Sequence, residues 1–221
     1  MWLGGAISYT DGNNDFANGD GDSETYAFTG YGSWLVDNGM FVDVTGKVGR
    51  LKNSFDISTT LGTASGSYNT NAFSLSAEAG WRLHPLDNSL YVEPQVEMMY
   101  GRVLDADYTT SMGVAVEHEA VDTLIGRVGF VLGLKCPNNR GNTYVRASIL
   151  HDWQGDAEST FTKGGQTKRI SEELGDTWLE YGVGANFNAT KNLHLYADLE
   201  ATEGAKVETS YRFNLGARWS F

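Results

Sequence analysis

The chain has 221 residues, of which 41% are hydrophobic, and carries a formal net charge of −12. Acidic residues outnumber basic ones by 28 to 16, and no Lys/Arg cluster offers a footprint for phosphate backbones, which argues against nucleic-acid binding. No stretch approaches the roughly 18 consecutive apolar residues of a transmembrane helix, which excludes a helical membrane protein but not a β-barrel, whose strands are only half apolar.

Side chains alternate between apolar and polar along most of the chain, and this period of two predicts strands rather than helices. Ten strands are expected, over residues 2–10, 24–36, 40–52, 70–84, 89–103, 121–135, 143–153, 176–188, 192–202 and 208–221. The pattern leaves open which face is apolar in the second and third of them. We therefore predict an all-β protein: one domain, residues 1–221, forming an antiparallel up-and-down transmembrane β-barrel.

The last predicted strand shows the alternation most clearly. One set of apolar or aromatic residues occupies every second position: Tyr211, Phe213, Leu215, Ala217, Trp219 and Phe221. Residues two apart in a strand point to the same face, so this strand has one apolar face. The segments "SLYVEPQVEMMYG", "TLIGRVGFVLGLK" and "LHLYADLEA" repeat the pattern. We predict that this apolar face contacts lipid.

Short and long connections alternate between the predicted strands. The short ones, "VDNG", "HPLDN", "CPNNRGN" and "NATKN", contain the Asn, Asp, Gly and Pro typical of turns. The long ones cover residues 11–23, 53–69, 104–120 and 154–175, and their polarity predicts loops. The last hairpin, near "TEGAKVE", is an exception, with a short connection on the long-loop side. Long loops at one end and tight turns at the other are typical of outer-membrane barrels. If the short turns are periplasmic, the C-terminus is periplasmic too.

A soluble β-sandwich is the alternative fold. Its strands usually have about five or six residues, whereas several strands predicted here are long enough to cross a membrane at a tilt. Charged residues on the polar faces would line the interior of a barrel: Glu78, Arg82, Glu93, Glu97, Arg127, Arg146, Glu180, Asp198, Glu200, Arg212 and Arg218. A narrow barrel has to balance charge inside, and this set mixes both signs.

Several segments resemble one family in consistent order. They are "WLGGAISYTDG", "YGSWLVDNGMFVDVTGKVGRLKNSFD", "EPQVEMMYGRV", "DTLIGRVGFVLGLK", "LHDWQGDAE" and "LGDTWLEYGVGANFNATKNLHLYADLEA". Together they resemble the translocator β-domain of autotransporters, the type V secretion proteins, over essentially the whole chain. The resemblance implies a twelve-stranded barrel in the Gram-negative outer membrane, with a helix through its pore, that anchors an N-terminal passenger and supports its export.

The resemblance also carries expectations about completeness and partners. The chain begins at what resembles the third strand, so we expect the domain to be incomplete at its N-terminus. The expected partners are outer-membrane lipid, the barrel-assembly machinery and a passenger domain upstream, and we expect no cofactor, no metal and no catalytic residue. The C-terminal segment resembles the signal read by that machinery, with Asn214, Gly216, Trp219 and Phe221 at the expected spacing.

The loop "DGNNDFANGDGDSE" is a candidate for calcium binding. Asp11, Asn13, Asp15 and Asp22 have spacings near those of a calcium-binding loop. Phe16, however, occupies the position of the sharp-turn glycine, and no helix is predicted on either side. We favour a solvated acidic loop.

The pair His151-Asp152, with Asp156 nearby, leaves open an alternative function: a ten-stranded outer-membrane protease. Such an enzyme needs a second acidic pair across the barrel mouth to position a water molecule. The acids that could supply it are Glu172, Glu173, Asp105 and Asp107. A simple junction between a strand and a loop is the other interpretation of His151-Asp152, and the one we favour.

Overall fold

A computed structural model describes residues 1–60, 62–85, 89–137, 140–204, 206 and 209–220. In these residues ten strands form one antiparallel sheet, in the order β1-β2-β3-β4-β5-β8-β9-β12-β13-β14, and four shorter strands form a second sheet, β11-β10-β7-β6. No helix in the described part of the chain is long and apolar enough to cross a membrane. The predicted all-β, antiparallel fold class is confirmed.

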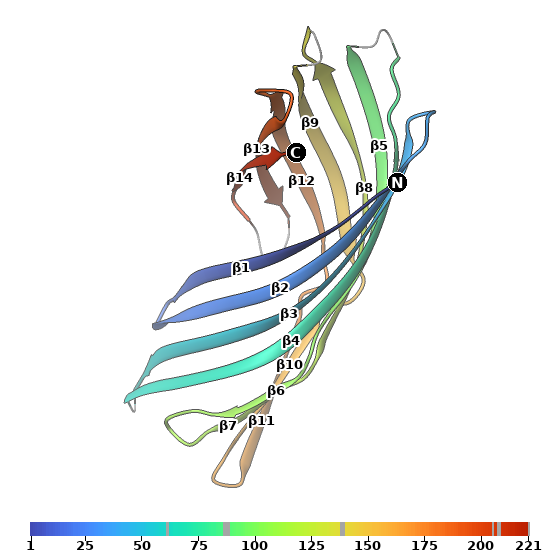
Figure 1. Cartoon of the computed structure of the whole chain (residues 1–221). Coiled ribbons are helices and arrows are strands. Elements are labelled where there is room, and N and C mark those ends of the chain that lie inside the picture. Colours follow the sequence, from blue (N-terminus) through green and yellow to red (C-terminus); the bar gives the residue numbers. More distant parts are fainter. Residues whose placement is uncertain (61, 86–88, 138–139, 205, 207–208, 221) are drawn as a thin grey trace.

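The strands of the large sheet match the ten predicted ones in number and order. They are β1 (Trp2–Phe16), β2 (Gly19–Leu35), β3 (Met40–Thr59), β4 (Gly62–Trp81), β5 (Leu90–Val103), β8 (Val121–Lys135), β9 (Gly141–Asp152), β12 (Thr177–Asn188), β13 (Leu193–Glu203) and β14 (Arg212–Trp219). The sheet curls strongly (Figure 1). Among the described residues β1 pairs only with β2 and β14 only with β13, so both are edge strands.

The loops predicted at 11–23 and 53–69 are wrong, because strands continue through both segments. The pairing of β1 with β2 runs on to Phe16 opposite Gly19, and that of β3 with β4 to Thr59 opposite Gly62. A hairpin is held by its main-chain hydrogen bonds, which do not require an apolar face. Polar side chains on both faces therefore weaken the apolar alternation without ending the strands.

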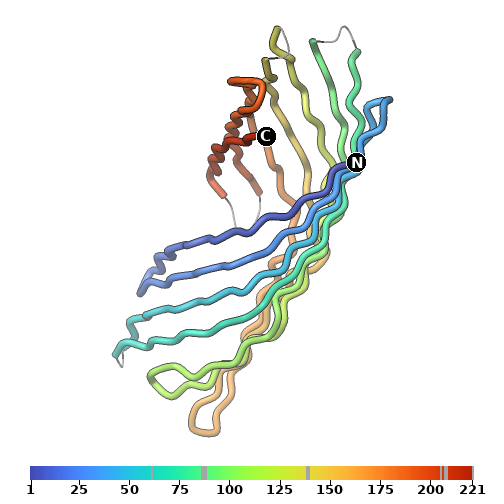
Figure 2. Tube along the Cα trace, viewed as in Figure 1, coloured from blue at the N-terminus to red at the C-terminus, as the bar shows by residue number. Residues whose placement is uncertain are grey.

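The loops predicted at 104–120 and 154–175 are also wrong in large part. They contain β6 (Ala106–Thr109), β7 (Ala115–His118), β10 (Asp156–Lys163) and β11 (Gln166–Glu173), the strands of the second sheet. Gly164 and Gly165 turn the chain between β10 and β11 with φ of 59° and 79°, a pair of positive values that favours Gly-Gly in a two-residue hairpin. The second sheet projects from the end of the large sheet opposite the short connections (Figure 2).

An aromatic cluster joins the second sheet to β3 and β4. The ring of Tyr108 stacks on Tyr68 with centroids 5.1 Å apart, and lies 5.9 Å from Phe55 and 5.4 Å from His118. Burial raises the pKa of Tyr108 to about 12, with Tyr68 adding to the shift. Val116, which is 1% exposed, completes a small core, so this part of the molecule is packed rather than loose.

Candidate functional site

The large sheet turns its apolar side chains outward and its charged side chains inward, the reverse of a soluble protein. Val128 on β8 is 65% exposed, whereas Glu93 on β5 is 4% exposed. Exposed large hydrophobic residues occur on all ten strands, and on β5, β8 and β14 they occupy the alternating positions that the sequence predicts. An apolar surface that extends over ten strands is unfavourable in water and typical of contact with another apolar phase.

Arg127 is the centre of the first inward-facing ion-pair group. Its Nη2 lies 2.8 Å from Glu78 Oε2 on β4, and its Nε lies 2.8 Å from Glu97 Oε2 on β5. Its Nη1 also donates to Gln95 Oε1 at 3.2 Å. The Arg127 side chain is only 12% exposed, so its charge is largely removed from water. One guanidinium therefore holds two acids from two strands.

A second group connects β9, β13 and β14. Arg146 forms an ion pair with Glu200, and its Nη2 lies 4.0 Å from Asp198 Oδ1. Arg212 Nη1 lies 3.7 Å from Glu200 Oε2, and Asn214 donates to Asp198 at 2.9 Å. Glu200 is buried between two guanidinium groups. Each acid of this group thus has a partner on a neighbouring strand.

A third group lies nearer the short connections. Arg82 Nε is 2.5 Å from Glu93 Oε2, and Gln95 donates to Glu93 Oε1 at 2.8 Å. The Arg82 guanidinium also lies 4.6 Å from the ring centroid of Tyr91, a cation–π contact. Tyr91 is 2% exposed because its ring covers Gly133, where a Cβ would overlap it. Tyr91 was not among the residues predicted to matter from the sequence.

A cavity of about 880 Å³ on the concave face brings most of the predicted interior charges together. The ones that line it are Glu78, Arg82, Glu93, Glu97, Arg127, Arg146, Glu180, Glu200 and Arg212. Asp198 joins through Arg146 and Asn214. Arg218 lies opposite His194 and is not among the described lining residues. A lumen needs a closed wall, so the lumen-facing role of all eleven stays a prediction.

Asp43 is a further acid of the concave face that was not predicted from the sequence. It lies opposite Glu78, which lies opposite Glu97, so three acids follow one another across β3, β4 and β5. Its buried Oδ1 has no hydrogen-bond partner among the described residues. The segment "MFVDVTG" did contain a signal, because Val42 and Val44 alternate with the polar residues Asp43 and Thr45.

The C-terminal signal residues occupy one strand, β14. Asn214 faces the interior through its bond to Asp198, and Gly216 lies opposite Tyr196, whose ring fills the place of a Cβ. Trp219 is exposed opposite Leu193. Phe221 lies outside the described residues. The role of these four residues in barrel assembly stays a prediction.

His151 and Asp152 have structural partners at the end of β9. His151 Nδ1 lies 2.7 Å from Thr177 Oγ1, and its ring packs edge-on against Trp153. Asp152 Oδ1 accepts the backbone N–H groups of Leu124 and Gln154, each at 3.0 Å. These bonds tie the carboxylate to a strand–loop junction. The protease alternative, with Glu172, Glu173, Asp105 and Asp107 as the second pair, is not favoured.

The acidic segment 11–24 is a hairpin rather than the loop that we predicted. Asn13 lies opposite Asp22 and Asp15 opposite Asp20, on paired strands. Within the described residues no group of three or more His, Cys, Asp or Glu side chains is placed to hold a metal ion.

Long antiparallel strands, an outward apolar surface and inward ion pairs together define a class of protein: the outer-membrane β-barrel. The family described as "Autotransporter beta-domain" matches residues 1–200, and this chain belongs to that family. Its β-domains are not catalytic in themselves, and membership indicates the Gram-negative outer membrane as the location.

Individual relatives agree with this assignment. The chain is 30% identical over 224 residues to the pertactin autotransporter of Bordetella parapertussis. The matched region covers 99% of this chain but 24% of that protein. The crystal structure of the β-domain of the Bordetella autotransporter BrkA matches with a TM-score of 0.75 and 25% identity, over 99% of this chain and 83% of that one. The translocator domain of NalP from Neisseria meningitidis shares the fold, with a TM-score of 0.80, 16% identity and coverage of 99% and 75%. The chain thus spans about a quarter of the length of the pertactin relative.

Proposed function

We propose that this chain is the membrane-embedded translocator of an autotransporter, which anchors an N-terminal passenger and supports its passage to the cell surface. The observation that carries the proposal is the inverted burial of the large sheet. Apolar side chains face outward, while charged side chains meet in ion pairs on the concave face. Family membership supports the same function.

The proposed mechanism is physical rather than chemical. The interior charges are largely paired with one another, so a polypeptide passing through would meet a hydrated surface without a strong single-sign attraction. Such a surface allows sliding, because no site holds the passing chain tightly. The domain itself performs no covalent step in this scheme, and it is not an enzyme.

The proposed orientation has the short connections and the C-terminus in the periplasm and the long hairpins with the second sheet outside. The length difference between the two sets of connections supports this, because outer-membrane barrels have short periplasmic turns. Lipid on the outward face and the barrel-assembly machinery at β14 are the partners proposed with it. In lipid the unpaired ladder groups of β1 and β14 require partners, which the two further strands implied by the family would supply.

Protease treatment of intact cells that express the full-length protein tests the proposal. A reporter fused as the passenger should be cleaved from outside, while the barrel stays protected. As a control, the same reporter with a secretion signal but without residues 1–221 should stay inaccessible. A correctly inserted barrel whose passenger remains in the periplasm would refute the function.

A further inference from the structure

The outward face of the large sheet is not uniformly filled. Across β9, β12 and β13 three small side chains lie side by side, because Thr143 pairs with Ala185 and Ala185 with Ala197. Leu134 borders this row on β8, and a parallel row of larger residues that includes Val183 lies two positions along the strands. The result is an apolar groove of about 600 Å³.

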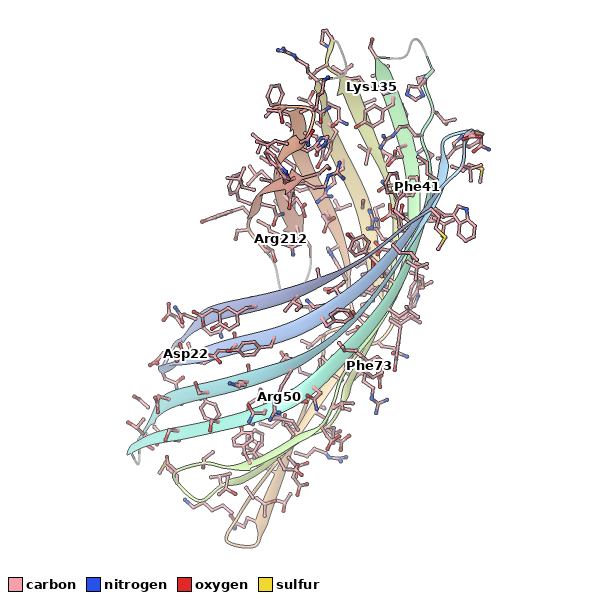
Figure 3. The ribbon with its side chains drawn as sticks, in the orientation of Figure 1. Asp22, Phe41, Arg50, Phe73, Lys135 and Arg212 are labelled. Atoms are coloured by element: carbon pink, nitrogen blue, oxygen red, sulfur yellow. The ribbon has the colours of Figure 1, made fainter. Side chains whose placement is uncertain are left out.

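The groove lies beside two of the short connections, and these two carry positive charge. Residues 135–142 and 188–194 contain Lys135, Arg140 and Lys191 and no acid. The opposite end differs sharply, since residues 11–24 contain five acids and no base. Figure 3 labels Lys135 and Asp22 at these two ends of the molecule. An anionic group beside the groove would therefore meet an attractive field.

Backbone contacts bring one of these cations within reach of the groove. The N–H of Asn188 donates to the carbonyl of Arg140 at 2.7 Å, and Asn188 follows Ala185 by three residues, which is about 10 Å along a strand. Arg140 and Lys191 are exposed, and no ion pair joins either side chain to another described residue. Lys135 is less available, because its Nζ lies 2.9 Å from His84 Nε2.

We propose that the groove is a phospholipid site: one acyl chain lies over Thr143, Ala185 and Ala197, and the phosphate of the same molecule is held by Arg140 and Lys191. An acyl chain fits because the groove is apolar and lies on the lipid side of the sheet. A phosphate fits because basic residues at a membrane surface attract anionic headgroups. The site requires the outward face to be in a membrane, but it does not depend on passenger export.

The experiment uses the full-length protein assembled in phosphatidylcholine vesicles that contain a minor fraction of photoactivatable phosphatidylglycerol, with a diazirine on its acyl chain. Cross-linked peptides are mapped by mass spectrometry. Labelling concentrated in 132–145 and 183–199 is the expected result. Ala185→Leu fills the groove and should reduce this labelling to the level of the remaining outward face, whereas the matched control Ala147→Leu, on the same face of β9 outside the groove, should not.

The headgroup contact has its own variant. Arg140→Gln with Lys191→Gln should lower the groove labelling by about fivefold for each cation removed, since each contributes roughly one kcal/mol near a charged surface. Uniform labelling of the outward face, or labelling that Ala185→Leu leaves unchanged, would overturn the site. Labelling that responds to Ala185→Leu but not to the double variant would overturn the phosphate contact. A cross-linked dimer through the groove in place of lipid labelling would assign it to a second copy of the chain.

Discussion

Arg127 on β8 holds Glu78 on β4 across the intervening strand β5, with 2.8 Å between Nη2 and Oε2. The same guanidinium binds Glu97 on β5, so one side chain connects three strands of the concave face. A buried charge is tolerated where a charge of opposite sign compensates it. Here Arg127 compensates the two acids, and the acids compensate Arg127. The ion pairs therefore connect neighbouring strands and contribute to the stability of the sheet.

Arg127→Gln should destabilise the folded domain by about 2–3 kcal/mol, because it leaves two largely buried acids without a cation. Denaturant unfolding in vesicles, followed by tryptophan fluorescence, measures the change. Glu78→Gln combined with Glu97→Gln in the same chain should recover part of the loss. Lys52→Gln, which removes the exposed partner of Glu24, is the control and should cost less than about 1 kcal/mol. Equal effects of Arg127→Gln and Lys52→Gln would contradict the role of burial.

Gly216→Ala should slow assembly and lower stability by about 1–3 kcal/mol, because the new methyl group overlaps the Tyr196 ring. Heat-modifiable gel mobility gives the folded fraction with time. The companion change Tyr196→Ser should relieve the defect if the overlap is its cause. Gly30→Ala is the matched control, since a Cβ there meets nothing within 4 Å. A defect in Gly216→Ala that persists with Tyr196→Ser would exclude the ring contact as its origin.

The second sheet should loosen in acid. Burial in the aromatic cluster lowers the pKa of His118 below its ordinary value of 6.5, although Asp107 offsets part of the shift. The folded state therefore prefers neutral His118, and this stability is complete above the unfolded pKa and falls as the pH drops below about 6.5. Hydrogen exchange of residues 106–118 should be faster at about pH 5.5 than at about pH 7.5.

His118→Gln supplies the control for this pH dependence. Glutamine can still bond to Ser159, which lies 2.7 Å from His118 Nδ1, but it does not titrate. The variant should show equal exchange in residues 106–118 at both pH values after correction for the intrinsic rate. An unchanged pH dependence would show that His118 is not its source.

The alternation of side chains could be predicted from the sequence because each strand carries it locally. Val128 and Phe213 are exposed on the outward face, as their places in the alternating pattern predict. The partners of Arg127 could not be predicted, since they depend on a register that joins residues 49 and 30 positions apart. Asp43 was missed because the facing of its strand was left open.

The predicted loops failed for a different reason. In 53–69 and 154–175 the strands project beyond the apolar band, so most side chains on both faces are polar and the apolar alternation is too short to predict a strand. Only the Gly164-Gly165 turn signalled a hairpin there, between "TFTK" and "QTKR". Local turn chemistry was therefore more informative than hydrophobic pattern outside the membrane-facing region.

Val128→Arg should destabilise the membrane-inserted domain by about 2–4 kcal/mol, because an outward arginine deep in the bilayer loses its hydration. Reversible unfolding from vesicles measures this cost. Asp22→Arg is the control, since that residue lies in the hairpin beyond the apolar band, and it should change stability by less than about 0.5 kcal/mol. Similar small effects of the two substitutions would show that Val128 faces water.

The contact between the outward face and hydrocarbon is tested most directly by spin labels at positions 128 and 95 in a Cys136→Ser background of the membrane-inserted protein. Relaxation by oxygen reports lipid exposure, and relaxation by a water-soluble nickel chelate reports water. The label at 128 should respond mainly to oxygen, and the label at 95 mainly to nickel. A label at 128 relaxed chiefly by the nickel chelate would contradict the membrane assignment of this face.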